Sequence, residues 1–231
     1  MLAFLTPLIV AYEIGSALYL TDPASHTVDT IRAHRLMGEV FHAFGVGGLF
    51  LPGVLLAVVL LLWHVLTRDT WKIDLRILPG MLAESVAWTL PLLVLWQIVA
   101  RASARVGELA AAAGGTADPF AAMSLPARLT ISVGAGLYEE LLFRMLGVAL
   151  LHFVFADLMR LRHTAAACAA VGVSAAAFAA YHLTPGEPIV WTRMVFYGLA
   201  GVYFGAIYAW RGFGVVVATH ALYDAVVLAL A

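Results

Sequence analysis

Hydrophobic residues follow one another along the chain in long, continuous blocks, and polar segments separate the blocks. A helix of about 20 apolar residues crosses the hydrocarbon core of a bilayer, so blocks of this length are typical of transmembrane helices. Membrane β-barrels instead show alternating apolar and polar residues, which is not the pattern of this chain. We therefore predict seven spans, at about Leu2–Leu20, Phe41–Leu66, Ile77–Ala100, Leu129–Phe155, Thr164–His182, Ile189–Trp210 and Phe213–Leu230.

The polar segments are of unequal length. Thr21–Glu39 follows the first block, Arg68–Arg76 follows the second, and Arg101–Arg128 precedes the fourth. We expect a short surface helix around Ala102–Ala113, and an eighth span within 21–40 or 101–128 stays open. With seven spans, the lysines and arginines of the connecting segments divide equally between the two sides. The positive-inside rule therefore does not orient the protein.

Composition supports a membrane protein of one domain. The 231 residues are 63% hydrophobic and 12% charged, whereas soluble domains are roughly 45–50% apolar. We expect an all-α, polytopic transmembrane helix bundle, with a single integral membrane domain over residues 1–231, in the cytoplasmic membrane of a bacterium. The first block lacks a basic start and contains Glu13, so we interpret it as a retained span rather than a signal peptide. A net charge of −1 does not favour a nucleic-acid partner.

Small residues fill the fifth and sixth blocks. The single cysteine, Cys168, excludes an intrachain disulfide. Its neighbours are alanines and no base lies at helical spacing, so we interpret it as a buried small residue rather than a nucleophile. The alanines around it, with Gly201 and Gly205 in the next block, predict close helix packing.

Three ionisable residues, Glu139, Glu140 and Arg144, interrupt the fourth block. A charge at the bilayer centre costs at least ~2.5–3.5 kcal/mol, so each such residue needs a structural or functional reason. Glu140 and Arg144 are four residues apart, which places them on one helix face where they can pair. Glu139 is rotated by about 100° from Glu140 and points toward another helix. Arg144 thus neutralises the carboxylate of Glu140, and the carboxylate of Glu139 remains available for catalysis.

Two further blocks each carry a pair of residues four positions apart that includes a histidine. Phe178 and His182 end the fifth block, and His220 and Asp224 lie within the seventh. Each group has an ordinary structural explanation, His182 as an interfacial anchor and His220 with Asp224 as a self-satisfied pair. Ionisable groups that are buried on three separate spans are nevertheless accommodated at the lowest cost in free energy when they pair with one another. We therefore predict one cluster of Glu139, His182, His220 and Asp224.

Such a cluster suits the hydrolysis of a peptide bond. A carboxylate beside imidazoles in a cavity of low dielectric constant can act as a general base toward water. A histidine and a second polar side chain can stabilise the oxyanion that forms when water attacks an amide.

These residues form an ordered set that resembles a known family. Glu139-Glu140-x-x-x-Arg144, Phe178-x-x-x-His182 and His220-x-x-x-Asp224 are similar to the motifs of the CPBP family of CAAX proteases and bacteriocin-processing enzymes, also called Abi proteins. One motif alone is weak evidence, but three in order, each in its own apolar block, are specific. The resemblance covers about Leu129–Leu230, the motif-bearing core, and the first three blocks match only in being hydrophobic.

The resemblance implies an intramembrane glutamic endopeptidase of about eight helical spans. In that family Glu139 would activate the water with help from His182, and Glu140 with Arg144 would brace the motif helix beside Phe178. His220 and Asp224 would form the oxyanion side. Relatives that cleave prenyl proteins usually carry Asn at the position of Asp224, and Asp donates a hydrogen bond only when protonated. The alternative role for Asp224 is to orient His220.

The dependence on a metal is a second open alternative. Members of the family were long described as metalloproteases, and Glu139, His182 and His220 are the set that would bind zinc. The chain contains no His-Glu-x-x-His motif, and we favour a mechanism without metal or other cofactor.

Other functions stay open beside the protease. A non-catalytic membrane scaffold or bacteriocin-immunity factor would use the cluster only as structure. A proton-coupled transporter would use the acids as a relay, but the chain shows no internal repeat. The remaining acids within spans, Glu13 and Glu84, are expected to bond across helices. The partners that we expect are the lipid bilayer and a membrane-associated peptide or protein substrate, with a C-terminal or leader tag as candidate substrates.

Overall fold

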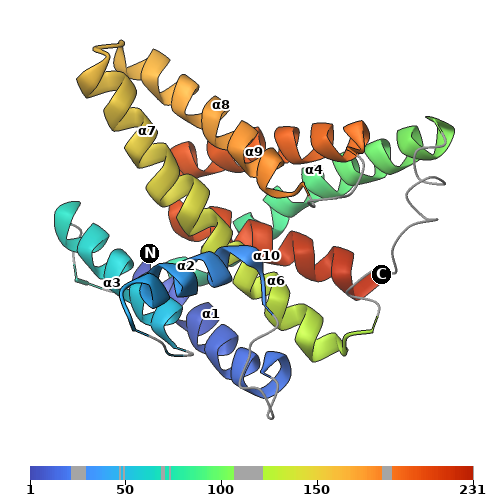
Figure 1. Ribbon diagram of the computed structural model, residues 1–231, viewed down its shortest axis with the longest axis horizontal. Helices are drawn as coiled ribbons and strands as arrows, with labels where there is room; N and C mark the ends of the chain where they lie inside the picture. Colours follow the sequence, from blue (N-terminus) through green and yellow to red (C-terminus); the bar gives the residue numbers. More distant parts are fainter. Residues whose placement is uncertain are drawn as a thin grey trace.

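A computed structural model describes residues 1–21, 30–46, 48, 50–68, 71–72, 74–106, 122–183 and 189–230, without the side chains of residues 103–106. Its elements are all helices, and the prediction of an all-α bundle is confirmed (Figure 1). They are α1 (Leu2–Gly15), η1 (Ser16–Leu20), α2 (Arg32–Ala43), α3 (Leu51–Leu66), α4 (Ile77–Val106), α6 (Leu125–Glu140), η2 (Leu141–Val148), α7 (Ala149–Phe153), η3 (Val154–Leu158), α8 (His163–Tyr181), α9 (Trp191–Arg211) and α10 (Phe213–Leu230). The elements η1, η2 and η3 are π-helical segments.

Five helical stretches of the described chain are long and apolar enough to cross a membrane. They are Leu2–Leu20, Ile77–Ala102, Leu125–Leu158, His163–Tyr181 and Phe213–Leu230. The predicted sixth span is present as α9, but this 21-residue helix is not among the five. It begins and ends with tryptophan and arginine residues, which lower its mean hydropathy.

The predicted second span is wrong in its first third. The chain from Phe41 onward does not continue as one helix, because α2 ends at Ala43 and α3 begins at Leu51. Between them Gly45 adopts a φ of 75°, a left-handed conformation that glycine tolerates without strain. The remaining α3 has 16 residues and is shorter than a full span.

The other connecting segments also differ from expectation. Part of the polar stretch Thr21–Glu39 belongs to α2, whose 12 residues measure roughly 18 Å and cannot cross a bilayer as an eighth span. Residues 102–106 of the predicted surface helix continue α4, and the rest of that prediction lies outside the described residues.

The helix α10 lies at the centre of the bundle, against α6, α4 and α9 (Figure 1). Every residue from Phe213 to Ala221 is buried. Gly136 brings α6 very close to α10, because a Cβ on this glycine would lie 2.6 Å from the carbonyl oxygen of Val217. The helices α6 and α10 are therefore closely packed at the level where His220 faces α6, the motif helix, which carries Glu139 and Glu140.

The predicted close packing of small residues is confirmed between α8 and α9. A Cβ on Gly201 would lie 2.9–3.1 Å from atoms of Ala175, and a Cβ on Gly205 would lie 2.6 Å from Val171. The helices α7 and α8 form the arm that projects at the upper left of Figure 1, and α9 crosses the middle of the view. Contacts between these helices hold His182, at the end of α8, against α9.

The expected burial of Cys168 is wrong, because its side chain is exposed. Ala166 and Ala170 face the neighbouring helices and are buried. Cys168 lies two residues from each, about 200° around the helix, and therefore points away from the bundle.

Both remaining acids within spans bond across helices, as expected. Tyr138 of α6 donates a hydrogen bond to Glu13 of α1 at 3.1 Å. Arg211 of α9 donates from Nη2 to Oε2 of Glu84 in α4 at 2.7 Å. Both contacts tie the outer helices to the bundle that holds the site.

Candidate active site

Glu139 and Glu140 are the last residues of α6, where the helix continues into the π-helical segment η2. Ser124 caps the start of α6, and its side chain accepts a hydrogen bond from the backbone N–H of Ala127 at 3.4 Å. π-helical segments within α-helices often occur at functional sites, because the wider turn reorients side chains. Here both carboxylates are buried, with exposed fractions of 5% for Glu139 and 0% for Glu140.

Glu140 is held by two cationic or proton-donating partners. Its Oε1 lies 3.1 Å from Nη1 of Arg144 and 2.7 Å from Nδ1 of His220. Arg144 also donates to the carbonyl oxygen of Gly201 at 3.3 Å. Its guanidinium lies over the ring of Phe178, 4.3 Å from the ring centroid. The Glu140–Arg144 pair that the spacing predicts thus joins α10, α9 and α8 to the motif helix.

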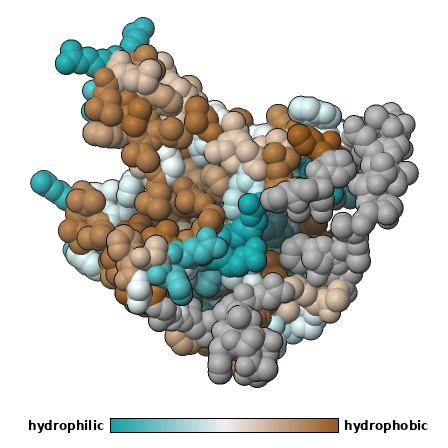
Figure 2. Space-filling view, in the orientation of Figure 1, coloured by the Kyte–Doolittle hydropathy of each residue, from teal (hydrophilic) through white to brown (hydrophobic). Residues whose placement is uncertain are grey.

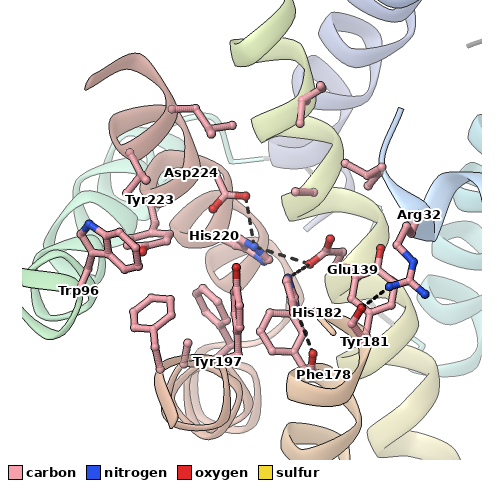
Figure 3. Close-up of a pocket in the computed structure, with 18 of the residues that line it drawn as sticks. Arg32, Trp96, Glu139, Phe178, Tyr181, His182, Tyr197, His220, Tyr223 and Asp224 are labelled. Atoms are coloured by element: carbon pink, nitrogen blue, oxygen red, sulfur yellow. Dashed lines mark hydrogen bonds and ion pairs between the residues drawn. The ribbon is translucent and has the colours of Figure 1, made fainter. Parts of the chain in front are cut away.

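Glu139 points in a different direction and faces both imidazoles (Figure 3). Its Oε2 lies 3.7 Å from Nε2 of His182 and 4.0 Å from Nε2 of His220. Both distances exceed a direct hydrogen bond. This buried oxygen has no hydrogen-bond partner within the described part of the chain. The carboxylate is therefore available to a molecule that enters the space between the two rings.

His182 is oriented by the end of its own helix and by α9. Its Nδ1 lies 2.8 Å from the carbonyl oxygen of Phe178, so this nitrogen carries the proton and Nε2 faces Glu139. The ring stacks on Tyr197 with a centroid distance of 3.8 Å and an interplanar angle of 18°. Arg32 of α2 donates to the carbonyl oxygens of Tyr181 and Leu183, at 2.6 and 3.2 Å. The backbone on both sides of His182 is therefore tied to α2.

His220 lies among three carboxylates. Its Nδ1 binds Glu140, while Nε2 lies 3.5 Å from Oδ2 of Asp224 and faces Glu139. Phe204 of α9 stacks on the ring, with a centroid distance of 4.5 Å. The chain turns from α9 into α10 at Gly212, whose φ of 83° requires glycine. This turn directs α10 back through the bundle and past both glutamates.

One cavity of about 530 Å³ connects these groups. Glu139, His182, His220 and Asp224 line it together with Phe178. Most of the remaining wall is aromatic or aliphatic, from residues Trp96, Ile131, Phe196, Tyr197, Tyr223, Val227 and Leu228. Figure 2 shows hydrophilic surface gathered over α2, in the middle of a face that is otherwise largely apolar. A polar reaction centre with an apolar surround can bind an apolar peptide and expose one bond to a base.

The structure brings together the four residues predicted to form a cluster. Their catalytic roles stay predictions, as do the supporting roles of Glu140, Arg144 and Phe178.

Sequence reasoning missed three contributions to the site. The hydrogen bond between His220 and Glu140 joins residues 80 positions apart, and no local spacing indicates it. Tyr197 gives no signal among the other aromatic residues of the sixth block. Arg32 and Arg35 line the cavity from α2. Their three-residue spacing places them on one helix face, but nothing in the sequence connects that face to the motif helix.

The positions of the possible donor side chains bear on the zinc alternative. Among residues 1–21, 30–46 and the other described ranges, no group of three or more His, Cys, Asp or Glu side chains is arranged to hold a metal ion. His220 also directs Nδ1 to Glu140 and Nε2 toward two carboxylates. We assign no chemical step to a metal.

Comparison with known proteins finds a family match for the second half of the chain. Residues 121–226 match the family described as type II CAAX prenyl endopeptidase Rce1-like. No curated protein and no solved structure matches the chain. The matched segment contains all seven predicted site residues, whereas α1–α4 lie outside it.

Proposed function

We propose that the chain is an intramembrane glutamic endopeptidase, because its residues 121–226 match the Rce1-like type II CAAX prenyl endopeptidases. Its substrate is a membrane-associated peptide or protein, and its nucleophile is a water activated by Glu139. The observation that carries this proposal is the meeting of Glu139 with His182 and His220 in one cavity.

In this mechanism Glu139 is the general base. Its unpartnered Oε2 removes a proton from a water that lies between the carboxylate and Nε2 of His182. His182 carries its proton on Nδ1, which donates a hydrogen bond to the carbonyl oxygen of Phe178. Its Nε2 can therefore accept a hydrogen bond from the same water. The water oxygen then forms a bond to the peptide carbonyl carbon, which gives a tetrahedral intermediate. The C–N bond of this intermediate breaks as the captured proton passes from Glu139 to the leaving amine.

His220 stabilises the oxyanion. In this proposal both ring nitrogens carry a proton. Nδ1–H donates to Glu140 at 2.7 Å, and Nε2–H is directed toward the cavity between Glu139 and Asp224. When the carbonyl oxygen gains negative charge, it accepts this second proton as a hydrogen bond. Asp224 lies 3.5 Å from Nε2 and accepts hydrogen bonds when ionised, which favours the role of orienting His220.

The surrounding wall strengthens these interactions. The ring of Phe178 lies against the guanidinium of Arg144. Phe204 stacks on His220, and Tyr197 stacks on His182. An apolar wall of this kind excludes bulk water, and electrostatic interactions between the catalytic groups and the oxyanion are stronger than they would be in solvent. Arg144 pairs with Glu140, so its positive charge stabilises the helix that carries both glutamates and does not contact the reacting bond.

The proposal is tested by comparing membrane proteomes of cells that express wild-type protein, Glu139→Gln or Glu13→Gln, and by reading newly formed peptide termini. Glu13 is the matched control, because its carboxyl also bonds within the bundle but does not line the cavity. We expect the new termini with wild type and Glu13→Gln. Loss of a general base lowers the rate roughly 10²–10⁴-fold, so Glu139→Gln should produce none.

Cleavage that persists in Glu139→Gln would remove this residue as the base. Full complementation of a deletion by Glu139→Gln, without any cleavage, would instead support the non-catalytic scaffold.

A further inference from the structure

His182 lies directly after the last residue of α8, where the helix ends. The last four carbonyl groups of a helix have no N–H partner one turn later and need other donors. The carbonyl oxygen of Ala179 accepts from the backbone N–H of His182 at 3.2 Å. The carbonyl oxygens of Tyr181 and Leu183 accept instead from Nη1 of Arg32 in α2, at 2.6 and 3.2 Å. A side chain from another helix thus binds the backbone on both sides of His182.

The charge and shape of Arg32 suit this position. A cation at the C-terminal end of a helix interacts favourably with the helix dipole. The guanidinium also lies 5.1 Å from the centroid of the Tyr181 ring. That ring in turn meets the ring of His182 edge-on, with a centroid distance of 5.1 Å and an interplanar angle of 81°. Arg32 therefore contacts the backbone beside His182 and also an aromatic ring that packs against its imidazole.

The same helix α2 also contacts the chain next to the other catalytic group. Its buried face includes His34, whose ring meets that of Tyr138 edge-on with a centroid distance of 5.0 Å. Tyr138 directly precedes Glu139 in the chain. Figure 3 shows Arg32 reaching from α2 toward Tyr181, beside Glu139. The helix α2 thus connects the end of α6 to the end of α8.

The separation between His182 and Glu139 depends on how the ends of their helices are held. Oε2 of Glu139 lies 3.7 Å from Nε2 of His182, so no direct hydrogen bond fixes this distance. Ser174 of α8 donates to the carbonyl oxygen of Phe143 at 2.7 Å, but it lies about two helical turns before His182. The contacts of Arg32 are at the last turn itself, where a small shift of the backbone moves the imidazole.

We propose that Arg32 is a positioning residue of the active site, which holds His182 at its distance from Glu139 through the carbonyl groups on either side. This inference rests on the proposed function, in which both residues bind the same water. Arg32 acts through the backbone and not on the reacting bond. Because α2 precedes residues 121–226, this positioning contact comes from a part of the chain that the family match does not cover.

The first measurement needs no turnover. Hydrogen–deuterium exchange is followed in detergent on peptides from the end of α8, for wild type, Arg32→Met and Glu39→Met. Methionine has a similar reach and no N–H donor. Glu39 is the matched control, because it is an exposed charged residue of α2 that does not line the cavity. We expect Arg32→Met to raise exchange at the amides of His182 and Leu183 by about 10-fold, as for loss of a charge-assisted hydrogen bond, and Glu39→Met to leave it unchanged.

The second measurement separates turnover from binding. The substrate is a peptide that spans a cleavage site lost in Glu139→Gln, and kcat and KM are determined for the same variants. A catalytic group displaced by about 1 Å can lower a rate roughly 10²-fold, and a loosened end of α8 misplaces His182 for part of the time. We expect Arg32→Met to lower kcat about 10-fold with KM within about twofold of wild type. Glu39→Met should leave both values unchanged.

Unchanged exchange at the end of α8 in Arg32→Met would overturn the inference, and so would a wild-type kcat or a loss confined to KM. If Arg32→Met is poorly folded, Arg32→Gln decides the matter by the same two measurements. If wild-type protein cleaves no peptide, the proposed function fails, while the exchange rates still decide whether Arg32 holds the end of α8. If wild type cleaves and Arg32→Met cleaves equally well, the inference alone fails.

Discussion

Substituting Gly136 by alanine tests whether the contact between α6 and α10 sets the geometry of the site. The added Cβ would lie 2.6 Å from the carbonyl oxygen of Val217 and 2.9 Å from the backbone nitrogen of Ala221. Both are backbone atoms of α10, so no side-chain rotation relieves the contact. Ordinary contacts begin near 3.4 Å, and α10 must therefore move away by about 0.8 Å.

That movement acts directly on the proposed catalytic distances. His220 follows Val217 by less than one helical turn and lies 4.0 Å from Oε2 of Glu139. A misplacement of about 1 Å between reacting groups can lower a rate roughly 10²-fold. Overpacking of a well-packed core costs about 1–3 kcal/mol. We therefore expect Gly136→Ala to reduce cleavage far more than its modest loss of stability explains.

The assay follows the rate of formation of the Glu139-dependent products, together with thermal unfolding in detergent. Gly198→Ala is the matched control, because a Cβ at Gly198 meets nothing within 4 Å and alanine favours the helix. It should retain the wild-type rate. If Gly136→Ala folds and cleaves within about twofold of wild type, the contact between the helices does not control the site, and the reasoning fails.

Three other predictions follow from the contacts of the site. Glu140→Ala should lower the free energy of unfolding by about 3–5 kcal/mol, and with it the protein level, because Arg144 and His220 lose a buried carboxylate partner. Glu140→Gln should lose less stability, and normal accumulation of Glu140→Ala would contradict this prediction. Tyr197→Leu should lower turnover about 2–10-fold through loss of the stacking on His182, whereas Tyr197→Phe should remain near wild type; equal rates of the two variants would count against it. Metal chelators should leave cleavage unchanged, and inhibition that added zinc reverses would favour the zinc-dependent alternative.

Local spacing was sufficient to predict side-chain pairs within one helix. Glu140 and Arg144 pair across four residues, and Asp224 lies beside His220 in the same way. These contacts follow from helical geometry alone. The sequence also placed Glu139 on a different face from Glu140, which the structure bears out.

Predictions failed where a helix boundary or a helix rotation was decided by something other than hydropathy. The block from Phe41 to Leu66 is apolar throughout, but the chain turns at Gly45. The fifth block is so rich in alanine that it has no distinct polar face, and the outward direction of Cys168 could not be inferred from it.

By itself, the sequence determined that the chain is a bundle of apolar helices and that three of these carry buried polar groups with a fixed local spacing. Those properties depend on hydrophobicity and on the helical repeat, which act within each segment. Only the tertiary structure decided that Glu140 accepts from His220, that Tyr197 stacks on His182, and that α2 brings Arg35 to the cavity. These contacts join residues that lie far apart in the sequence or on separate helices, and their existence depends on how each helix is rotated and how closely glycines let its neighbours approach.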